Sequence, residues 1–144
     1  MTPFWRADVA DWVAAHIDGC GRGFEACQAL GVLDKSGNIC AGIVFHDWSP
    51  EHGTIELSAA ATDRRWLTRT VAGVAMGYAF QVARLALART SEHNKPVRRL
   101  WRALGANEYE IPELWGPRES GVILTLTEAQ WQASRLYEPK RGGI

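Results

Sequence analysis

The chain has 144 residues, of which 47% are hydrophobic and 22% are charged, and its 16 Lys and Arg residues balance its 16 Asp and Glu residues. This composition predicts one compact domain over residues 1–144 and excludes a disordered chain. No apolar run approaches the roughly 20 residues that cross a bilayer, and the first residues lack the pattern of a signal peptide. The three cysteines form no C-x-x-C pair, and an odd number argues against a disulfide framework. We therefore expect a cytoplasmic protein that does not bind membranes.

The first predicted element is a helix. Apolar and aromatic side chains recur from Val9 to Ile17 at the spacing i, i+3, i+4, i+7 and i+8, which is typical of an amphipathic helix. Asp8 is placed to cap its start and Gly19 to end it. Residues 19–23 hold three glycines and are interpreted as a loop. The first 23 residues are therefore expected to form a helix and a loop.

Three strands are predicted next by short apolar runs between polar turns. They cover roughly residues 24–33, 38–46 and 53–61. The segments between them are rich in Asp, Ser, Gly and Asn, which is the chemistry of tight turns. Short strands joined in this way indicate an antiparallel meander.

The hydrophobic period then changes from that of strands to that of a helix. Residues 68–82 have one apolar face, and Gly73 and Gly77 within them are expected to allow close packing against a neighbour. Residues 84–90 follow as a short strand. A strand, a helix and a strand in this order imply a parallel pair joined by a right-handed crossover.

The remaining elements are predicted mainly by their caps. Asn94 is placed to begin a helix and Gly105 to end it. Residues 106–115 and 121–126 are expected to pair as strands. Thr127 and Gln130 fit a capping box at the start of a last helix, and residues 137–144 are expected to be a flexible tail.

Charge is segregated along this neutral chain. The segment from residue 64 to residue 102 holds nine of the 16 basic residues and a single acid, Glu92. The nine are Arg64, Arg65, Arg69, Arg84, Arg89, Lys95, Arg98, Arg99 and Arg102. A local positive field of this kind attracts anions even when the whole chain is neutral.

The order of elements and one segment resemble the GNAT superfamily of N-acetyltransferases. Residues 94–106, N-K-P-V-R-R-L-W-R-A-L-G-A, look like the family's Asn-x-x-(small)-x-x-(Leu/Phe)-Tyr-x-x-x-Gly-Phe segment after its fifth strand. Residues 124–131 resemble the end of the ribosomal-protein-acetyltransferase branch, and similar short chains occur in phages. The resemblance covers roughly residues 24–132. It implies an α/β (α+β) fold with a mixed, mostly antiparallel sheet, a parallel pair of fourth and fifth strands, and flanking helices.

The resemblance also implies an acetyl-CoA site where the fourth and fifth strands splay apart. The family binds pyrophosphate with an Arg/Gln-x-x-Gly-x-Gly/Ala loop, where backbone N–H groups and a positive helix end attract the anion. In this chain threonines occupy the two glycine positions, so hydroxyls and arginines are expected to supply donors instead. A solvent-exposed basic helix start fits the same stretch. The predicted donor-site residues are Ser58, Ala60, Arg64, Arg65, Thr68, Arg69, Thr70 and Asn94.

A base for the acceptor amine is expected on the fourth strand. Several family members use a glutamate there through a water molecule, and Glu56 matches it because it faces away from Ile55 and Leu57. A solvent-facing strand residue explains Glu56 equally well. His46 is a weaker candidate for the same role. The spacing of the His and Cys residues predicts no metal site.

The family's general acid is a tyrosine, and Trp101 stands in its place. An indole cannot deliver a proton, so Trp101 is expected to be part of the core. Tyr78, Tyr109, Ser91 or water remain as substitutes, unless the CoA thiolate leaves unassisted. The predicted catalytic residues are Glu56, Asn94 and Ser91.

The sequence thus predicts an acetyl-CoA-dependent N-acetyltransferase that moves acetyl directly to a primary amine. The acceptor stays open between a small amine, a protein and a nucleic acid; the four glutamates of residues 106–120 suit a cationic amine. A monomer or a homodimer is expected. The alternative is a non-catalytic binding module of the same fold that holds nucleic acid through the basic segment.

Overall fold

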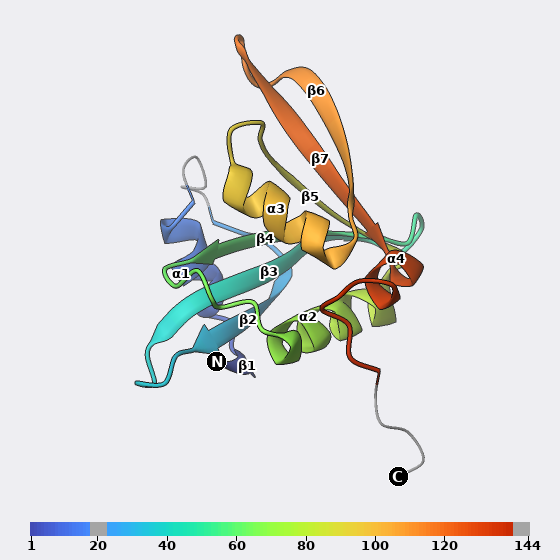
Figure 1. Cartoon of the computed structure of the whole chain (residues 1–144). Helices are drawn as coiled ribbons and strands as arrows, with labels where there is room; N and C mark the ends of the chain where they lie inside the picture. The colour runs from blue at the N-terminus through green and yellow to red at the C-terminus, as the bar shows by residue number, and fades with distance from the viewer. Residues whose placement is uncertain (18–22, 140–144) are drawn as a thin grey trace.

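The computed structural model describes residues 1–17 and 23–139, which form a seven-stranded sheet with four helices (Figure 1). The strands are β1 (Thr2–Trp5), β2 (Cys27–Leu33), β3 (Ile39–Ser49), β4 (Thr54–Ala61), β5 (Leu85–Ser91), β6 (Asn107–Gly116) and β7 (Glu119–Thr127). The helices are α1 (Val9–Ala15), α2 (Arg69–Val82), α3 (Lys95–Leu104) and α4 (Glu128–Gln132). The sheet order is β1-β2-β3-β4-β5-β7-β6, with β4 and β5 parallel and the other neighbours antiparallel. The predicted fold class is confirmed.

The N-terminal segment differs from the prediction in two respects. β1 is an edge strand paired with β2, and the sequence analysis did not predict it; four residues that include a proline carry too short a pattern to recognise. Asp8 is the N-cap of α1, as predicted, but it makes no capping hydrogen bond, because its backbone is helical and its carboxylate instead bonds Arg6, at 2.5 Å. The predicted stop at Gly19 and most of the predicted loop lie outside the described residues.

Among the described residues, α1 is the only helix on its face of the sheet. Val9 and Val13 pack there with Ala29 and Val44. The approach is close: a Cβ added to Gly42 would lie 2.6 Å from the side chain of Val13. Glycine is therefore needed on β3 so that α1 can reach the sheet.

The other face carries α2, α3 and α4 over the larger core. Ile55 and Leu57 of β4 lie in that core with Val71 of α2, Trp101 of α3 and Trp131 of α4. The core position predicted for Trp101 is confirmed. None of the helices in the described ranges is both long enough and apolar enough to cross a membrane.

Two glycines of α2 do not play the predicted part. A Cβ added to Gly73 or to Gly77 would meet nothing within 4 Å, and both residues are exposed. The expectation that they allow close packing is wrong; they lie on the solvent side of the helix.

The predicted caps of α3 and α4 are confirmed. The Asn94 side chain accepts from the Val97 N–H, Gly105 ends α3 with φ of 99°, and Thr127 forms the capping box with Gln130. The tail prediction is wrong at its start, because the ring of Tyr137 packs edge-on against Trp131, at 5.3 Å between centres. The rest of the predicted tail, from residue 140, lies outside the described residues.

Candidate active site

The central feature of the sheet is a fork between its two parallel strands. β4 and β5 pair only at Thr54–Leu85, Ile55–Ala86 and Glu56–Leu87. Beyond this point β4 stays paired with β3 as far as Ala61, and β5 stays paired with β7 as far as Ser91. Within the described ranges, Leu57–Ala61 and Ala88–Ser91 therefore face each other without a ladder, and we call this gap the fork. The splaying that the resemblance implies is confirmed.

The open end of β4 leads directly to the start of α2. Thr68 is the N-cap, and its hydroxyl accepts from the Val71 N–H. The N–H groups of Arg69 and Thr70 have no acceptor inside a helix that starts there, so they remain for a ligand. Thr68 has φ of −80°, so this backbone does not require glycine. The threonine thus replaces glycine without strain, although its hydroxyl occupies one N–H.

Arginines surround this helix start. Arg64, Arg65 and Arg69 are exposed, while Trp66 is buried and anchors the loop that carries them. Asp63 orders the loop by accepting from the Arg65 N–H at 2.9 Å. Positive side chains and helix N–H groups in one place form an arrangement that binds phosphate.

Glu56 lies where the fork opens. It is only 9% exposed, and its two carboxylate oxygens accept from Nε and Nη2 of Arg89, each at 3.1 Å. Arg89 lies two residues beyond Leu87, the partner of Glu56, so both side chains are on the face that α1 covers. The negative charge of Glu56 is therefore held by a bidentate ion pair.

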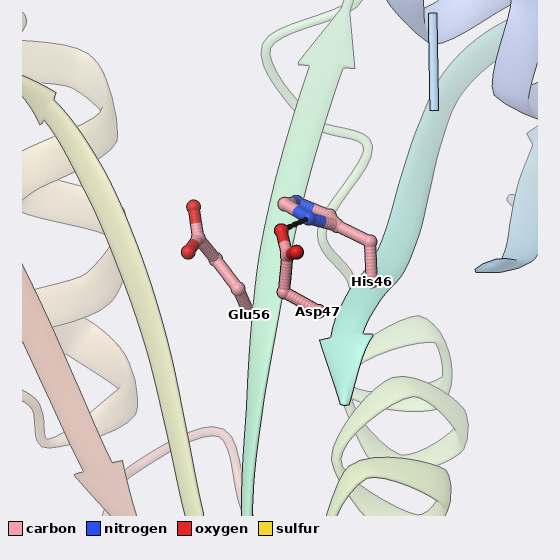
Figure 2. Close-up of side chains that lie close together, drawn as sticks. All are labelled: His46, Asp47 and Glu56. Carbon is pink, nitrogen blue, oxygen red and sulfur yellow. Dashed lines mark hydrogen bonds and ion pairs between the residues drawn. The ribbon is translucent and has the colours of Figure 1, made fainter. Parts of the chain in front are cut away.

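Two further groups lie beside Glu56 on that face. His46 is its register partner on β3, and the imidazole bonds the Asp47 carboxylate and the Ser58 hydroxyl. Figure 2 shows the His46 imidazole joined to the Asp47 carboxylate, with Glu56 close by and its carboxylate extended away from that pair. Their potential metal-ligand atoms lie within 4.8 Å of one another, but both ring nitrogens and both Glu56 oxygens already have protein partners. The geometry is therefore that of a hydrogen-bond network.

The other predicted catalytic residues lie at the far end of β5. The Ser91 hydroxyl donates to Glu119 and accepts from the His93 N–H. Asn94 caps α3 and donates to the Thr90 hydroxyl at 2.9 Å. Four residues of strand separate Ser91 from the Leu87 position, which is about 13 Å. The structure does not bring Ser91 and Asn94 to Glu56.

The candidate acids divide between the faces of the sheet. Tyr78 contacts Phe45 and Trp5 on the α2 side, opposite Glu56. Tyr109 is exposed on β6, and its register runs through Ile123 to Arg89, which places it on the Glu56 face. Of these two tyrosines, only Tyr109 lies on the same face of the sheet as Glu56.

Two of the four acids of the last hairpin are engaged by partners in the structure. Glu108 binds Arg98 and Arg102, and Glu119 binds Ser91. Hydrogen bonds from Arg98 lower the pKa of the Glu108 carboxyl below its usual value. Glu108 and Glu110 also pair with buried Leu124 and Val122, so they point to the α3 side of the sheet.

The basic segment is largely neutralised by acids from elsewhere in the chain. Among the described residues, five of its nine bases form ion pairs: Arg65, Arg69, Arg89, Arg98 and Arg102. The positive field of the basic segment is therefore weaker than the sequence alone suggests. The other four bases have no ion pair within the described ranges and are exposed on three separate segments, before α2, before β5 and on α3: Arg64, Arg84, Lys95 and Arg99.

Two residues of the site, Asp47 and Arg89, were not predicted from the sequence. Arg89 could have been found from the sequence. It is a charged residue on the fifth predicted strand, which was expected to lie beside the strand that carries Glu56. Asp47 could not have been found in this way: it falls in a segment interpreted as a turn, and its contact with His46 depends on a bulge in β3.

Comparison with known proteins supports the same fold. No protein-family model matches the sequence, and no curated protein matches it. Solved structures do match. The spermidine/spermine N-acetyltransferase SpeG of Vibrio cholerae (mutant forms) aligns with a TM-score of 0.70 at 11% identity, over 90% of this chain and 96% of that one.

Two other acetyltransferase structures align over less of their length. The ribosomal-protein-S5-alanine acetyltransferase of Vibrio fischeri has a TM-score of 0.61 at 14% identity, over 73% of this chain and 63% of that one. A protein described as a probable acetyltransferase has a TM-score of 0.60 at 16% identity, over 72% and 62%. This chain thus spans less than two thirds of those two proteins. The chain has the fold of the GNAT N-acetyltransferases, as the resemblance implied.

Proposed function

We propose that the protein is an acetyl-CoA-dependent N-acetyltransferase that moves an acetyl group directly to a primary amine. The observation that carries this proposal is the fork, which opens at Glu56 and leads along β4 to the basic start of α2. The unpaired strand edges of the fork can bind the amide groups of a pantetheine arm, and the basic helix start can bind a pyrophosphate. The acetyltransferase fold supports the same reading.

The donor is proposed to lie along β4. Its pyrophosphate accepts from the N–H groups of Arg69 and Thr70, with Arg64 and Arg65 nearby. Its pantetheine arm runs past Ala60 and Ser58, whose strand has no partner on the β5 side. Open backbone N–H groups on that side can polarise the thioester carbonyl. The acetyl group then lies near Glu56, where β4 and β5 meet.

The acceptor is proposed to approach from the α1 face. Glu56, Asp47 and His46 lie there, and the carboxylates suit a cationic amine. Two probe amines follow from the structural neighbours: spermidine, and a peptide that begins with alanine. The amine must lose a proton before it attacks, and Glu56 and His46 are the candidate acceptors. A cytoplasmic location and a monomeric or dimeric state remain predictions.

Calorimetric titration with CoA tests donor binding. We expect binding, and we expect Arg69→Glu to weaken it at least tenfold, because the substitution puts a negative charge beside the phosphates. Arg118→Glu, at the distant hairpin tip, is the matched control and should leave the affinity unchanged. No binding at millimolar CoA would exclude the proposal. An equal loss in both variants would mean that only the overall charge matters.

A further inference from the structure

Three side chains beside the fork form a hydrogen-bonded chain. The Ser58 Oγ lies 2.8 Å from Nε2 of His46, and Nδ1 of His46 lies 2.6 Å from a carboxylate oxygen of Asp47. In Figure 2 the imidazole and the Asp47 carboxylate are joined, with Glu56 next to them. The hydroxyl lies within hydrogen-bond reach of a base, and a third group orients that base. Proteins use this arrangement to move protons from weak acids.

The backbone of β3 is bent in a way that builds this chain. Successive strand residues point to opposite faces, so a regular β3 would turn Asp47 away from His46. The register between β3 and β4 instead shifts after His46, and Asp47 has φ of 51°, a left-handed value that few non-glycine residues adopt. The bulge returns the carboxylate to the preceding ring. Backbone strain of this kind clusters at functional sites.

The partners assign the hydrogen-bonding roles. An ionised carboxylate only accepts, so Nδ1 donates to Asp47 and carries the ring hydrogen. In the neutral imidazole Nε2 is then an acceptor, and the Ser58 hydroxyl donates to it. In this state the Ser58 oxygen has lone pairs for a donor on its other side, while the ring can take the serine's proton.

Groups on every neighbouring element face His46. Its register partners are Cys27 on β2 and Glu56 on β4, and Arg89 of β5 binds Glu56. Burial, with the charge of Asp11 on α1, raises the pKa of the Cys27 thiol, which is therefore neutral near neutral pH. Phe24 covers the imidazole at 4.9 Å between ring centres, and its exposed neighbour is Glu25.

The alternative proton acceptor is already engaged. Both oxygens of Glu56 accept from Arg89, so a proton on Glu56 would have to disrupt a bidentate ion pair. His46 has no such obstacle at Nε2. His46 can also exchange protons with solvent through Asp47. The Asp47 side chain is 77% exposed, whereas that of His46 is 11% exposed.

We propose that His46 takes the proton of the acceptor amine through the Ser58 hydroxyl, with Asp47 as a positioning residue. This rests on the proposed acetyl transfer. The substrate ammonium gives one proton to the Ser58 oxygen as the serine's own proton passes to Nε2. The neutral amine attacks the thioester carbon, the C–N bond forms and the C–S bond breaks. The second amine proton goes to the departing sulfur, and the imidazolium returns its proton to solvent.

Steady-state kinetics with the better probe amine test the role of His46. His46→Gln is expected to lower kcat by about 100-fold, the usual worth of a general base, with the KM for acetyl-CoA unchanged. In this variant the fall of kcat on acidification should begin at a higher pH than in the parent protein, because only amine that has already lost its proton to solvent can then react. His52→Gln, on the exposed turn before β4, is the matched control and should behave as the parent.

The two partners of His46 give separate readouts. Ser58→Ala should lower kcat as His46→Gln does, and the double variant should lose no more than either single one, because the residues act as a unit. Asp47→Asn keeps the backbone but not the ring's orientation, and it should lower kcat while Asp34→Asn does not. Mass spectrometry under turnover should find no acetyl group on Ser58.

The results that contradict this proposal differ from those that contradict the proposed function. Intact CoA binding with an undiminished kcat in His46→Gln overturns the relay alone, and so does an acetylated Ser58, which would make the serine a nucleophile. Nitrogen NMR of the imidazole needs neither donor nor acceptor. It should show the hydrogen on Nδ1 at neutral pH, and the other tautomer overturns the relay whether or not CoA binds.

Discussion

Thr68 replaces the glycine of the family's motif without straining the backbone. At the start of α2 the resemblance calls for glycine, yet the φ of −80° suits threonine and the hydroxyl caps the helix. The price is one backbone N–H, which Thr68 occupies and glycine would leave open. The chain therefore gains helix stability where it gives up a donor to the anion.

We expect Thr68→Ala to lower the free energy of unfolding by about 1 kcal/mol, because the Val71 N–H loses its acceptor. Thr68→Gly should lower the free energy of unfolding by only a few tenths of a kcal/mol, since glycine is itself an acceptable N-cap. Urea denaturation of the three proteins measures the difference. Equal stability of Thr68→Ala and the parent would show that this hydroxyl does not cap the helix in solution.

Residues whose role depends on nearby sequence were predictable, and those that depend on distant contacts were not. Asn94, Gly105 and Thr127 were identified as caps, because a cap needs only the next few residues. Asp8 is an exception, because the contact that takes its carboxylate is also local, with an arginine two positions earlier. The partnership of Arg89 with Glu56 arises only when β5 pairs with β4.

At the scale of elements, α2 carries a weakness that its packing does not require. Gly73 and Gly77 lie in the helix interior with helical backbone, and an added methyl group on either would meet nothing. Glycine costs about 1 kcal/mol relative to alanine in such a position. The helix spacing was predictable from the sequence, but the direction in which the glycines point was not.

Replacing these glycines should stabilise the protein. We expect Gly73→Ala and Gly77→Ala each to raise the free energy of unfolding by about 0.5–1 kcal/mol, seen as a higher Tm. Gly105→Ala is the opposite case, because φ is 99° and the new Cβ would lie 2.7 Å from the Gln130 carbonyl oxygen. It should lower the Tm. A loss of stability in both α2 variants would mean that this face of the helix is covered.

The meander and the crossover were also predictable, because their apolar periods are clear over seven or more residues. β1 was not, and the reason is its length. Its identity as a strand comes from the ladder offered by β2, which a four-residue pattern cannot reveal.

At the scale of the whole molecule, ion pairs and hydrogen bonds between different segments link stability to pH. Arg98 of α3 lowers the pKa of Glu108 on β6, and the Ser120 N–H lowers the pKa of Glu92 after β5. A carboxyl with a lowered folded-state pKa stabilises the fold above its unfolded pKa, about 4.3 for glutamate, and loses that contribution as the pH falls through the folded value.

Stability should therefore fall as the pH is lowered from about 5, in part through Glu108. We expect Glu108→Gln to be less stable than the parent at neutral pH and to show a shallower dependence on acid. Glu51→Gln, on an exposed turn, is the control. Denaturant unfolding at several pH values measures both. Parallel curves for Glu108→Gln and the parent would show that the α3–β6 pair does not contribute.

The short ladder between β4 and β5 has a consequence for the solution behaviour of the protein. A sheet normally has two edges, here β1 and β6, but the fork adds two more in its middle. Unpaired strand edges are templates for association with other chains. A ligand arm that lies in the fork would act as a missing strand and shield both edges. The donor would then be part of the architecture as well as a substrate, and the ligand-free protein would be the form most prone to aggregate.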